Sequence, residues 1–146
     1  MIFDSLIVGG GVSGMQCALV LGSANTKPFA NNKRIGIITH QRASHLENAL
    51  FNNVLGLAPK TLGKDILNEG LEQLSSLYPH ITQIDNERVL NIEEVDELYL
   101  ITTNKKKYSS KILILALNYS KPFTIKGLDH YLIPHKKSNP KKDRIQ

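Results

Sequence analysis

The sequence predicts an α/β fold with a parallel sheet, built as a single domain. The chain has 146 residues, which suits one hydrophobic core. Its first 40 residues run strand, glycine-rich turn, helix, strand, and a βαβ unit of this kind pairs its two strands in parallel. Between residues 80 and 116, short apolar runs alternate with polar turns and predict an antiparallel β-meander inserted into the sheet.

The first half of the chain supplies the βαβ unit. Residues 3–8 are apolar and rich in strand formers, and this predicted strand stops at three glycines. A helix is expected over residues 13–21, where small or apolar side chains recur at helical spacing and keep the face that packs on the sheet small. Residues 35–39 form the second buried strand, and residues 40–57 are expected to form an active-site type loop with one helical turn.

A second helix and the meander follow. The helix is expected to start at Thr61, which caps or nearly caps it, and to run to about Tyr78 before Pro79 stops it. Its apolar face is expected to contain Ile66, Leu67, Gly70, Leu71, Leu74 and Leu77. The later strands are expected at residues 80–84, 88–92, 98–103 and 112–116, with a hairpin turn at 104–107 leading into Tyr108.

The glycine-rich turn fits the G-x-G-x-x-G pattern and lies between a strand and a helix, where its mechanism requires it. Gly9 permits the tight turn, Gly11 lets the backbone approach a pyrophosphate, and Gly14 lets the helix pack closely on the strand. The N–H groups around Val12 and Ser13 open the helix and are suited to bind phosphate oxygens. The motif therefore predicts a Rossmann-like dinucleotide site, with a glycine turn that binds no ligand as the alternative.

The ribose side of this site lacks its usual residue. An acidic side chain normally ends the second strand and accepts hydrogen bonds from the ribose hydroxyls. Here that position is held by Thr39, His40 or Gln41. These side chains can still form hydrogen bonds with a ribose.

The distribution of charge argues against nucleic-acid binding, a signal peptide and a membrane span. Of the net charge of +5, residues 136–146 carry +4, from Lys136, Lys137, Lys141, Lys142 and Arg144 against Asp143. The rest of the chain carries about +1, so nucleic-acid binding is not expected. The uncharged stretch 6–22 is preceded by Asp4 and interrupted by glycines, so neither a signal peptide nor a membrane span is predicted, and a cytoplasmic location is expected.

Isolated reactive residues have ordinary interpretations. The lone Cys17 cannot form an internal disulfide or a CxxC pair and is expected to be a buried small hydrophobe. The histidines show no metal-ligand spacing, so no metal site is predicted. The lysines at 105–107 are expected at a solvated turn and the acidic residues at 93–97 on an exposed edge, and spacing assigns no catalytic residue.

Residues 3–128 resemble the FAD-binding part of the thioredoxin reductase-like branch of the FAD-dependent pyridine nucleotide-disulfide oxidoreductases. The stretch from Leu6 to Ala18 is similar to the FAD fingerprint, and Phe51-Asn52-Asn53-Val54-Leu55-Gly56-Leu57 to the loop near the flavin. Val89 stands where the family's backbone touches adenine. The run from Lys111 to Asn118, with Pro122 and Gly127-Leu128, is similar to the family's strand ending in Ala-Thr-Gly and its downstream residues.

The chain also departs from that family. Ala116-Leu117-Asn118 replaces Ala-Thr-Gly, no CxxC is present, and neither a second glycine-rich βαβ unit for NADPH nor the family's C-terminal Gly-Asp pair is found. The resemblance therefore implies a minimal or truncated FAD domain over residues 1–130, followed by a basic tail at 131–146 without a strand or helix. Weak FAD binding is expected unless a second copy or another chain completes the pocket.

The sequence thus predicts an FAD-binding, oxidoreductase-like flavoprotein that is related to thioredoxin reductase. The predicted cofactor contacts are Gly9, Gly11, Val12, Ser13, Gly14, Thr39, His40, Asn53, Val89 and Ala116. A non-catalytic nucleotide-binding or interaction module, the remnant of a longer flavoenzyme, is the alternative, and NAD(P) binding through the same loop is a third. Substrate and electron donor are not indicated.

Overall fold

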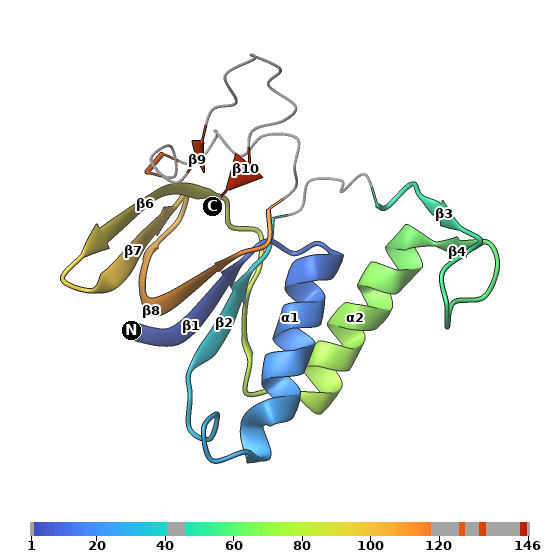
Figure 1. The fold of residues 1–146 in the computed structure, drawn as a ribbon, viewed down its shortest axis with the longest axis horizontal. Coiled ribbons are helices and arrows are strands. Elements are labelled where there is room, and N and C mark those ends of the chain that lie inside the picture. The colour runs from blue at the N-terminus through green and yellow to red at the C-terminus, as the bar shows by residue number, and fades with distance from the viewer. Residues whose placement is uncertain (1, 41–45, 118–125, 128–131, 134–143, 146) are drawn as a thin grey trace.

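A computed structural model describes residues 2–40, 46–117, 126–127, 132–133 and 144–145. Its centre is a six-stranded sheet with the strand order β5-β2-β1-β8-β7-β6. Two helices, α1 (Val12–Ser23) and α2 (Gly63–Leu77), lie side by side against the sheet (Figure 1). The predicted α/β, Rossmann-like fold with a parallel sheet and an antiparallel meander is confirmed.

Four strands form the parallel part of the sheet: β5 (Thr82–Ile84), β2 (Ile35–Ile38), β1 (Ile2–Val8) and β8 (Lys107–Leu115). The last residue of β1, Val8, pairs with Ile38 on one side and with Leu115 on the other. The chain therefore leaves β1 toward β2 and returns to its opposite side as β8. This reversal of strand order next to β1 is a topological switch point, where α/β sheets bind ligands beyond their carboxyl ends.

The meander extends the same sheet. Strands β6 (Val89–Val95) and β7 (Leu98–Thr103) pair with each other, and β7 pairs with β8, all antiparallel. The predicted start of the strand at residue 112 is wrong. Instead β8 is continuous: its first part pairs with β7 and its later part with β1, and Ser109 and Ser110 pair with both neighbours.

Two clusters of buried side chains hold the layers together. One joins the helices to the sheet and contains Ile7, Met15, Ala18, Ile35, Ile37, Leu74 and Ile81. The other consists of strand residues and joins the parallel and antiparallel parts; it contains Phe3, Leu6, Val8, Ile38, Ile84, Val89, Ile92 and Ile101. Burial of these apolar side chains is the main force holding the glycine turn at the sheet edge.

The second helix begins later than predicted and buries less of its surface. Thr61 is not its cap: it lies in β4 (Thr61–Leu62), and its hydroxyl donates to the carbonyl of Ala58 at 2.6 Å. Leu62 is the N-cap residue. Of the expected apolar face only Gly70 and Leu74 are buried, while Leu71 and Leu77 are exposed, because a narrow stripe of α2 meets α1.

Glycines allow that close contact between the helices. A Cβ at Gly70 would lie 2.8 Å from Cγ of Met15 on α1. A Cβ at Gly22 would lie 2.7 Å from Cγ of Tyr78, at the end of α2. The expectation that Gly22 faces the sheet is therefore corrected, since it faces the second helix.

The segment after β2 also differs from prediction. Residues 46–48 form a turn, and β3 (Leu50–Phe51) pairs with β4 as a short antiparallel hairpin that the sequence did not indicate. A three-residue 3-10 helix, η1 (Ala24–Thr26), follows α1. No helix in the described part of the chain is both long and apolar enough to cross a membrane.

The C-terminal part is described only in short pieces. Lys126 lies along β6, where its carbonyl accepts from Ile92 N at 2.9 Å, and Gly127 has a φ of 93°. Strands β9 (Leu132–Ile133) and β10 (Arg144–Ile145) pair antiparallel, so the expected tail without a strand is corrected there. The predicted residues Gln41, Asn118, Pro122 and Leu128, and the basic stretch 136–142, lie outside the described residues.

Candidate functional site: the glycine turn at the sheet edge

The glycine turn begins directly after β1 with Gly9, whose φ is 125°. This left-handed region is accessible to glycine and strained for other residues. The Gly9 N–H donates to the carbonyl of Ile38 at 3.0 Å, and a Cβ at this position would collide with the carbonyl oxygen of Ala116. Gly9 therefore fixes the turn against the ends of both neighbouring strands.

Gly14 brings helix α1 onto the turn. A Cβ there would collide with the carbonyl oxygen of Gly9 and lie 3.2 Å from Cβ of Ala116. Ala116 itself is held by a hydrogen bond from its N–H to the carbonyl of Val8 at 2.9 Å. The structure thus brings together three predicted site residues, Gly9, Gly14 and Ala116, at the switch point between β1 and β8.

Gly11 has a different environment. A Cβ at this position would meet no atom within 4 Å among the described residues, although Gly11 lies inside a tightly packed turn. It is the N-cap of α1, with φ −76° and ψ −179°, and no side chain caps the helix. Val12 and Ser13 follow it and are exposed. The first N–H groups of α1 consequently have no side-chain acceptor among the described residues.

The end of β2 borders the turn through Thr39. A Cβ at Gly10 would lie 2.9 Å from Cβ and Cγ2 of Thr39. The Thr39 hydroxyl donates to Oδ1 of Asp85 at 2.7 Å, and the Thr39 N–H donates to the carbonyl of Ile84 at 2.8 Å. His40 is exposed beside it. Sequence reasoning missed Asp85, although it directly follows a predicted strand.

Two further predicted contacts, Asn53 and Val89, belong to other elements than the glycine turn. Asn53 is exposed in the loop that connects β3 to β4, and Figure 1 shows that hairpin beyond the N-terminal end of α2, on the side away from α1. Val89 is 6% exposed and packs in the cluster between the two parts of the sheet, so its side chain is a core residue. The predicted contact of Val89 is through its backbone, and it stays a prediction, as does the contact of Asn53 near the flavin.

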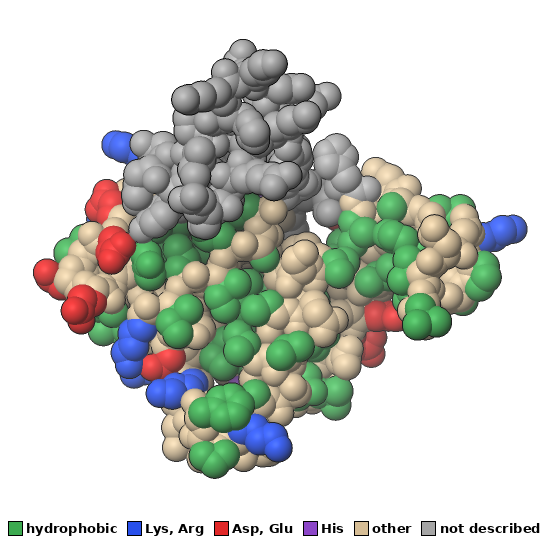
Figure 2. All heavy atoms as spheres, in the orientation of Figure 1, with side chains coloured by type: hydrophobic (Ala, Val, Ile, Leu, Met, Phe, Trp, Pro, Cys, Tyr) green, Lys and Arg blue, Asp and Glu red, His purple; other side chains and the backbone are tan. Residues whose placement is uncertain are grey.

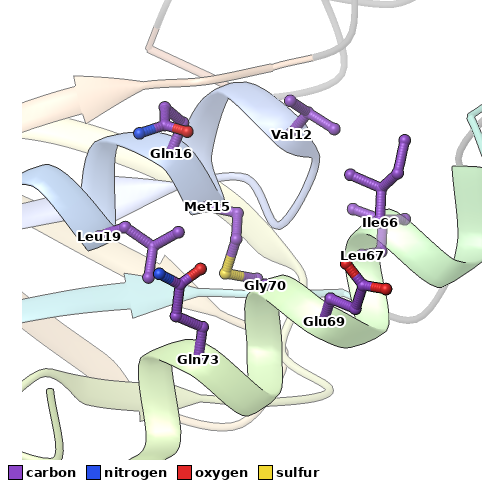
Figure 3. Close-up of a pocket in the computed structure, with 9 residues that line it drawn as sticks. All are labelled: Val12, Met15, Gln16, Leu19, Ile66, Leu67, Glu69, Gly70 and Gln73. Carbon is purple, nitrogen blue, oxygen red and sulfur yellow. The ribbon is translucent and has the colours of Figure 1, made fainter. Parts of the chain in front are cut away.

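A groove of about 170 Å³ lies between α1 and α2. Figure 3 shows side chains from both helices around it, with Met15 beside Gly70 at its floor. Its walls are mostly apolar, with Gln16, Glu69 and Gln73 adding polar groups. Small-molecule sites usually have volumes of about 300–1,000 Å³, so we do not assign the cofactor to this groove.

A buried polar cluster supports the segment after β5. Glu87 is 5% exposed and accepts hydrogen bonds from the hydroxyls of Thr103 at 2.6 Å and Tyr108 at 2.9 Å. Burial, together with the bond to Glu87, raises the pKa of Tyr108 to about 12. The Glu87 N–H donates to the carbonyl of Thr39 at 3.1 Å, which links this cluster to the end of β2.

The remaining candidate groups lie in ordinary surroundings. Cys17 is half-buried against the helix–sheet cluster, and burial raises the pKa of its thiol. The described residues contain no group of three His, Cys, Asp or Glu side chains arranged to hold a metal ion. The acidic residues at the β6–β7 turn are exposed as predicted, and Figure 2 shows them gathered at the left edge of the molecule.

The chain is similar to part of several known reductases. No family model matches the chain. Two ferredoxin–NADP reductases from Streptococcus agalactiae, serotypes Ia and III, are each 27% identical to it over 117 residues, which cover 79% of this chain and 34% of theirs. The resemblance to the FAD-dependent oxidoreductase family is confirmed. The chain spans about a third of the length of these relatives.

Solved structures show the same fold. An oxidoreductase from Agrobacterium tumefaciens superposes with a TM-score of 0.65 at 23% identity, over 79% of this chain and 36% of that one. A thioredoxin reductase from T. acidophilum gives 0.61 at 22% identity, over 78% and 34%. The chain therefore has the fold of one segment of these reductases and is related in sequence to ferredoxin–NADP reductases.

Proposed function

We propose that this chain binds FAD at the glycine turn and acts as the FAD-binding part of an oxidoreductase. The observation that carries the proposal is the open space at Gly11. Its two neighbours in the motif, Gly9 and Gly14, are glycines because the fold has no room for a Cβ, whereas a Cβ at Gly11 would meet no atom of a described residue within 4 Å. A cradle of this kind lets a pyrophosphate approach the backbone.

The residues present fit such a ligand. The uncapped N–H groups at the start of α1 supply hydrogen-bond donors and the positive end of the helix dipole to the phosphates. Thr39 and His40 lie at the end of the adjacent strand, where a ribose is expected. The resemblance of residues 3–128 to the FAD-binding part of the family favours FAD over NAD(P) as the nucleotide in this segment.

A bound flavin would supply hydride and electron transfer, and the chain would bind and orient it. The sequence contains one cysteine, so disulfide exchange through a CxxC pair is not part of the activity we propose for these 146 residues. The turn would hold the phosphates through backbone groups, and the close approach of Gly9 to Ala116 fixes the conformation of the turn.

A titration of the full chain with FAD, followed by quenching of flavin fluorescence, tests this proposal. We expect saturable binding by the parent protein and no measurable binding by Gly11→Val, because the valine fills the space left for the pyrophosphate. Far-UV circular dichroism should show both proteins folded, since a Cβ at this position would meet no described atom within 4 Å and the φ of −76° suits any residue.

Asn31→Val is the matched control. It places a valine at an exposed residue of the loop before β2, at the end of the sheet opposite the glycine turn. This variant should bind FAD like the parent protein. Equal affinity in Gly11→Val and the parent would refute the proposal. NADPH in place of FAD tests the NAD(P) alternative, and preferential binding of NADPH would favour it.

A further inference from the structure

Three neighbouring parallel strands end at the same edge of the sheet, and the residues that follow them are joined by hydrogen bonds. Gly9 follows β1 and donates from its N–H to Ile38 O at 3.0 Å. Thr39 follows β2 and donates from its N–H to Ile84 O at 2.8 Å. Asp85 follows β5 and accepts from the Thr39 hydroxyl at 2.7 Å. The Asp85 carboxylate is therefore fixed at the edge that carries the glycine turn.

The carboxylate is also accessible. Asp85 is exposed, and its only hydrogen bond or ion pair to a described residue is the one that Oδ1 accepts from Thr39. Oδ2 accepts no hydrogen bond from a described residue. The Thr39 side chain lies between Asp85 and the turn, because its Cβ and Cγ2 would be 2.9 Å from a Cβ at Gly10.

The segment that carries Asp85 is held in place from several sides. Asn86, the next residue, has a φ of 59°, and the Glu87 N–H donates to Thr39 O at 3.1 Å. The Glu87 side chain is buried and bonded to Thr103 and Tyr108. Because these contacts are already formed in the protein, ligand binding does not have to order the segment, and an acceptor there is preorganised.

We propose that Asp85 is the specificity-determining residue of the nucleotide site and that its carboxylate accepts hydrogen bonds from the hydroxyls of the adenosine ribose. The end of β2, where that carboxylate usually stands, carries Thr39 and His40 in this chain. The acceptor is supplied from β5 instead, through Thr39. This inference rests on the proposed function and narrows the ligand to dinucleotides whose adenosine ribose carries no 2′-phosphate, because that phosphate would face a carboxylate of like charge.

The experiment measures the affinity of the full chain for three probes by fluorescence quenching: FAD, an FAD analogue built on 2′,3′-dideoxyadenosine, and an FAD analogue with a phosphate on the adenosine 2′-oxygen. For the parent protein we expect each analogue to bind about tenfold more weakly than FAD, since a hydrogen bond to a charged group is worth ~1.4 kcal/mol or more. For Asp85→Ala we expect the three affinities to converge. Asp85→Asn is uncharged but similar in size. For this variant we expect a smaller difference in affinity between FAD and the analogue with the 2′-phosphate.

Glu72→Ala is the matched control, because it removes an exposed carboxylate from α2 and should leave the parent's discrimination unchanged. If Asp85 only stabilised the contact between β5 and β2, Asp85→Ala would lower the affinity for all three probes by the same factor. That result would overturn the inference. Unchanged discrimination would overturn it as well. If the parent protein bound none of the probes, the proposed function itself would fail. If it bound FAD but Asp85→Ala kept the parent's discrimination, only this inference would fail.

Discussion

At the scale of single residues, the three glycines of the motif do three different things. Gly9 adopts a φ of 125° and Gly14 touches the carbonyl of Gly9, so both are needed for the turn to form. Gly11 has an ordinary φ of −76°, and a Cβ there would meet no described atom within 4 Å, so the described part of the fold does not require a glycine there. A glycine at this position is what the proposed pyrophosphate site requires, since only glycine lets the phosphates approach the backbone there.

Tyr108 provides a prediction about pH. Burial and its bond to Glu87 raise its pKa to about 12, above the value of about 10 in an unfolded chain. Since the neutral phenol is favoured in the folded state, its contribution to the free energy of unfolding is full below pH 10 and is lost as the pH rises toward 12.

We therefore expect Tyr108→Phe to lower the free energy of unfolding by about 1 kcal/mol at neutral pH. The difference between parent and variant should shrink between pH 10 and 12. Urea unfolding of both proteins across that range measures it. The control is Tyr99→Phe, because no hydrogen bond is found between the Tyr99 hydroxyl and a described residue. If the difference in free energy of unfolding between the parent and Tyr108→Phe stayed constant from pH 10 to 12, the raised pKa of Tyr108 would be contradicted.

At the scale of elements, the contact between α1 and α2 depends on Gly70. A Cβ there would lie 2.8 Å from Cγ of Met15, which is 4% exposed and has little room to move. Leucine has a higher helix propensity than glycine, so any loss of stability in Gly70→Leu must come from overpacking. We expect a loss of about 1–3 kcal/mol in urea unfolding.

The double variant Met15→Ala/Gly70→Leu separates this contact from other effects. Met15→Ala alone leaves a cavity and should be destabilising, whereas in the double variant the leucine occupies part of that space. The two changes should therefore cost less together than the sum of the separate costs. Glu72→Leu, at an exposed position of the same helix, is the control and should leave stability nearly unchanged. Strictly additive losses would show that the residues do not share a contact.

Local patterns in the sequence predicted the elements well where neighbouring residues determine them. The glycines end β1, and the bounds of β7 were predicted as residues 98–103. The early start of β8 was missed because residues 109–111 are polar and do not fit the apolar pattern of the predicted strand at 112–116. Ser110 is nonetheless fully buried, and its hydroxyl donates to Ile112 O at 2.7 Å. A polar residue satisfied by its own backbone segment fits inside a sheet.

At the scale of the whole molecule, what could not be predicted was contact between distant segments. The pattern of α2 indicated an apolar face, but which part of it meets α1 depends on tertiary packing, so Leu71 and Leu77 are exposed. The candidate site likewise contains residues that a local motif predicts and a contact that only the folded structure reveals. Gly9, Gly11 and Gly14 were found from one local motif, whereas the bond between Thr39 and Asp85 joins residues 46 positions apart and becomes visible only when β2 and β5 pair.

That joining of distant strands leads to a prediction for the entire fold. The proposed FAD site is built on the ends of β1, β2 and β5 and on the start of α1, so the site exists only in the folded protein. A ligand that binds only the folded state stabilises it by about 2.7 kcal/mol at a concentration 100 times its Kd. For a chain of 146 residues this corresponds to a rise in Tm of about 5–11 °C.

We expect FAD to raise the Tm of the parent protein by this amount and to leave the Tm of Gly11→Val unchanged, when both are followed by circular dichroism at 222 nm. Flavin mononucleotide is the ligand control, since it lacks the adenosine half and the pyrophosphate that the glycine turn would hold. It should produce a much smaller shift. If FAD and flavin mononucleotide raised the Tm equally, the flavin ring alone would account for binding, and the glycine turn would not be the pyrophosphate site.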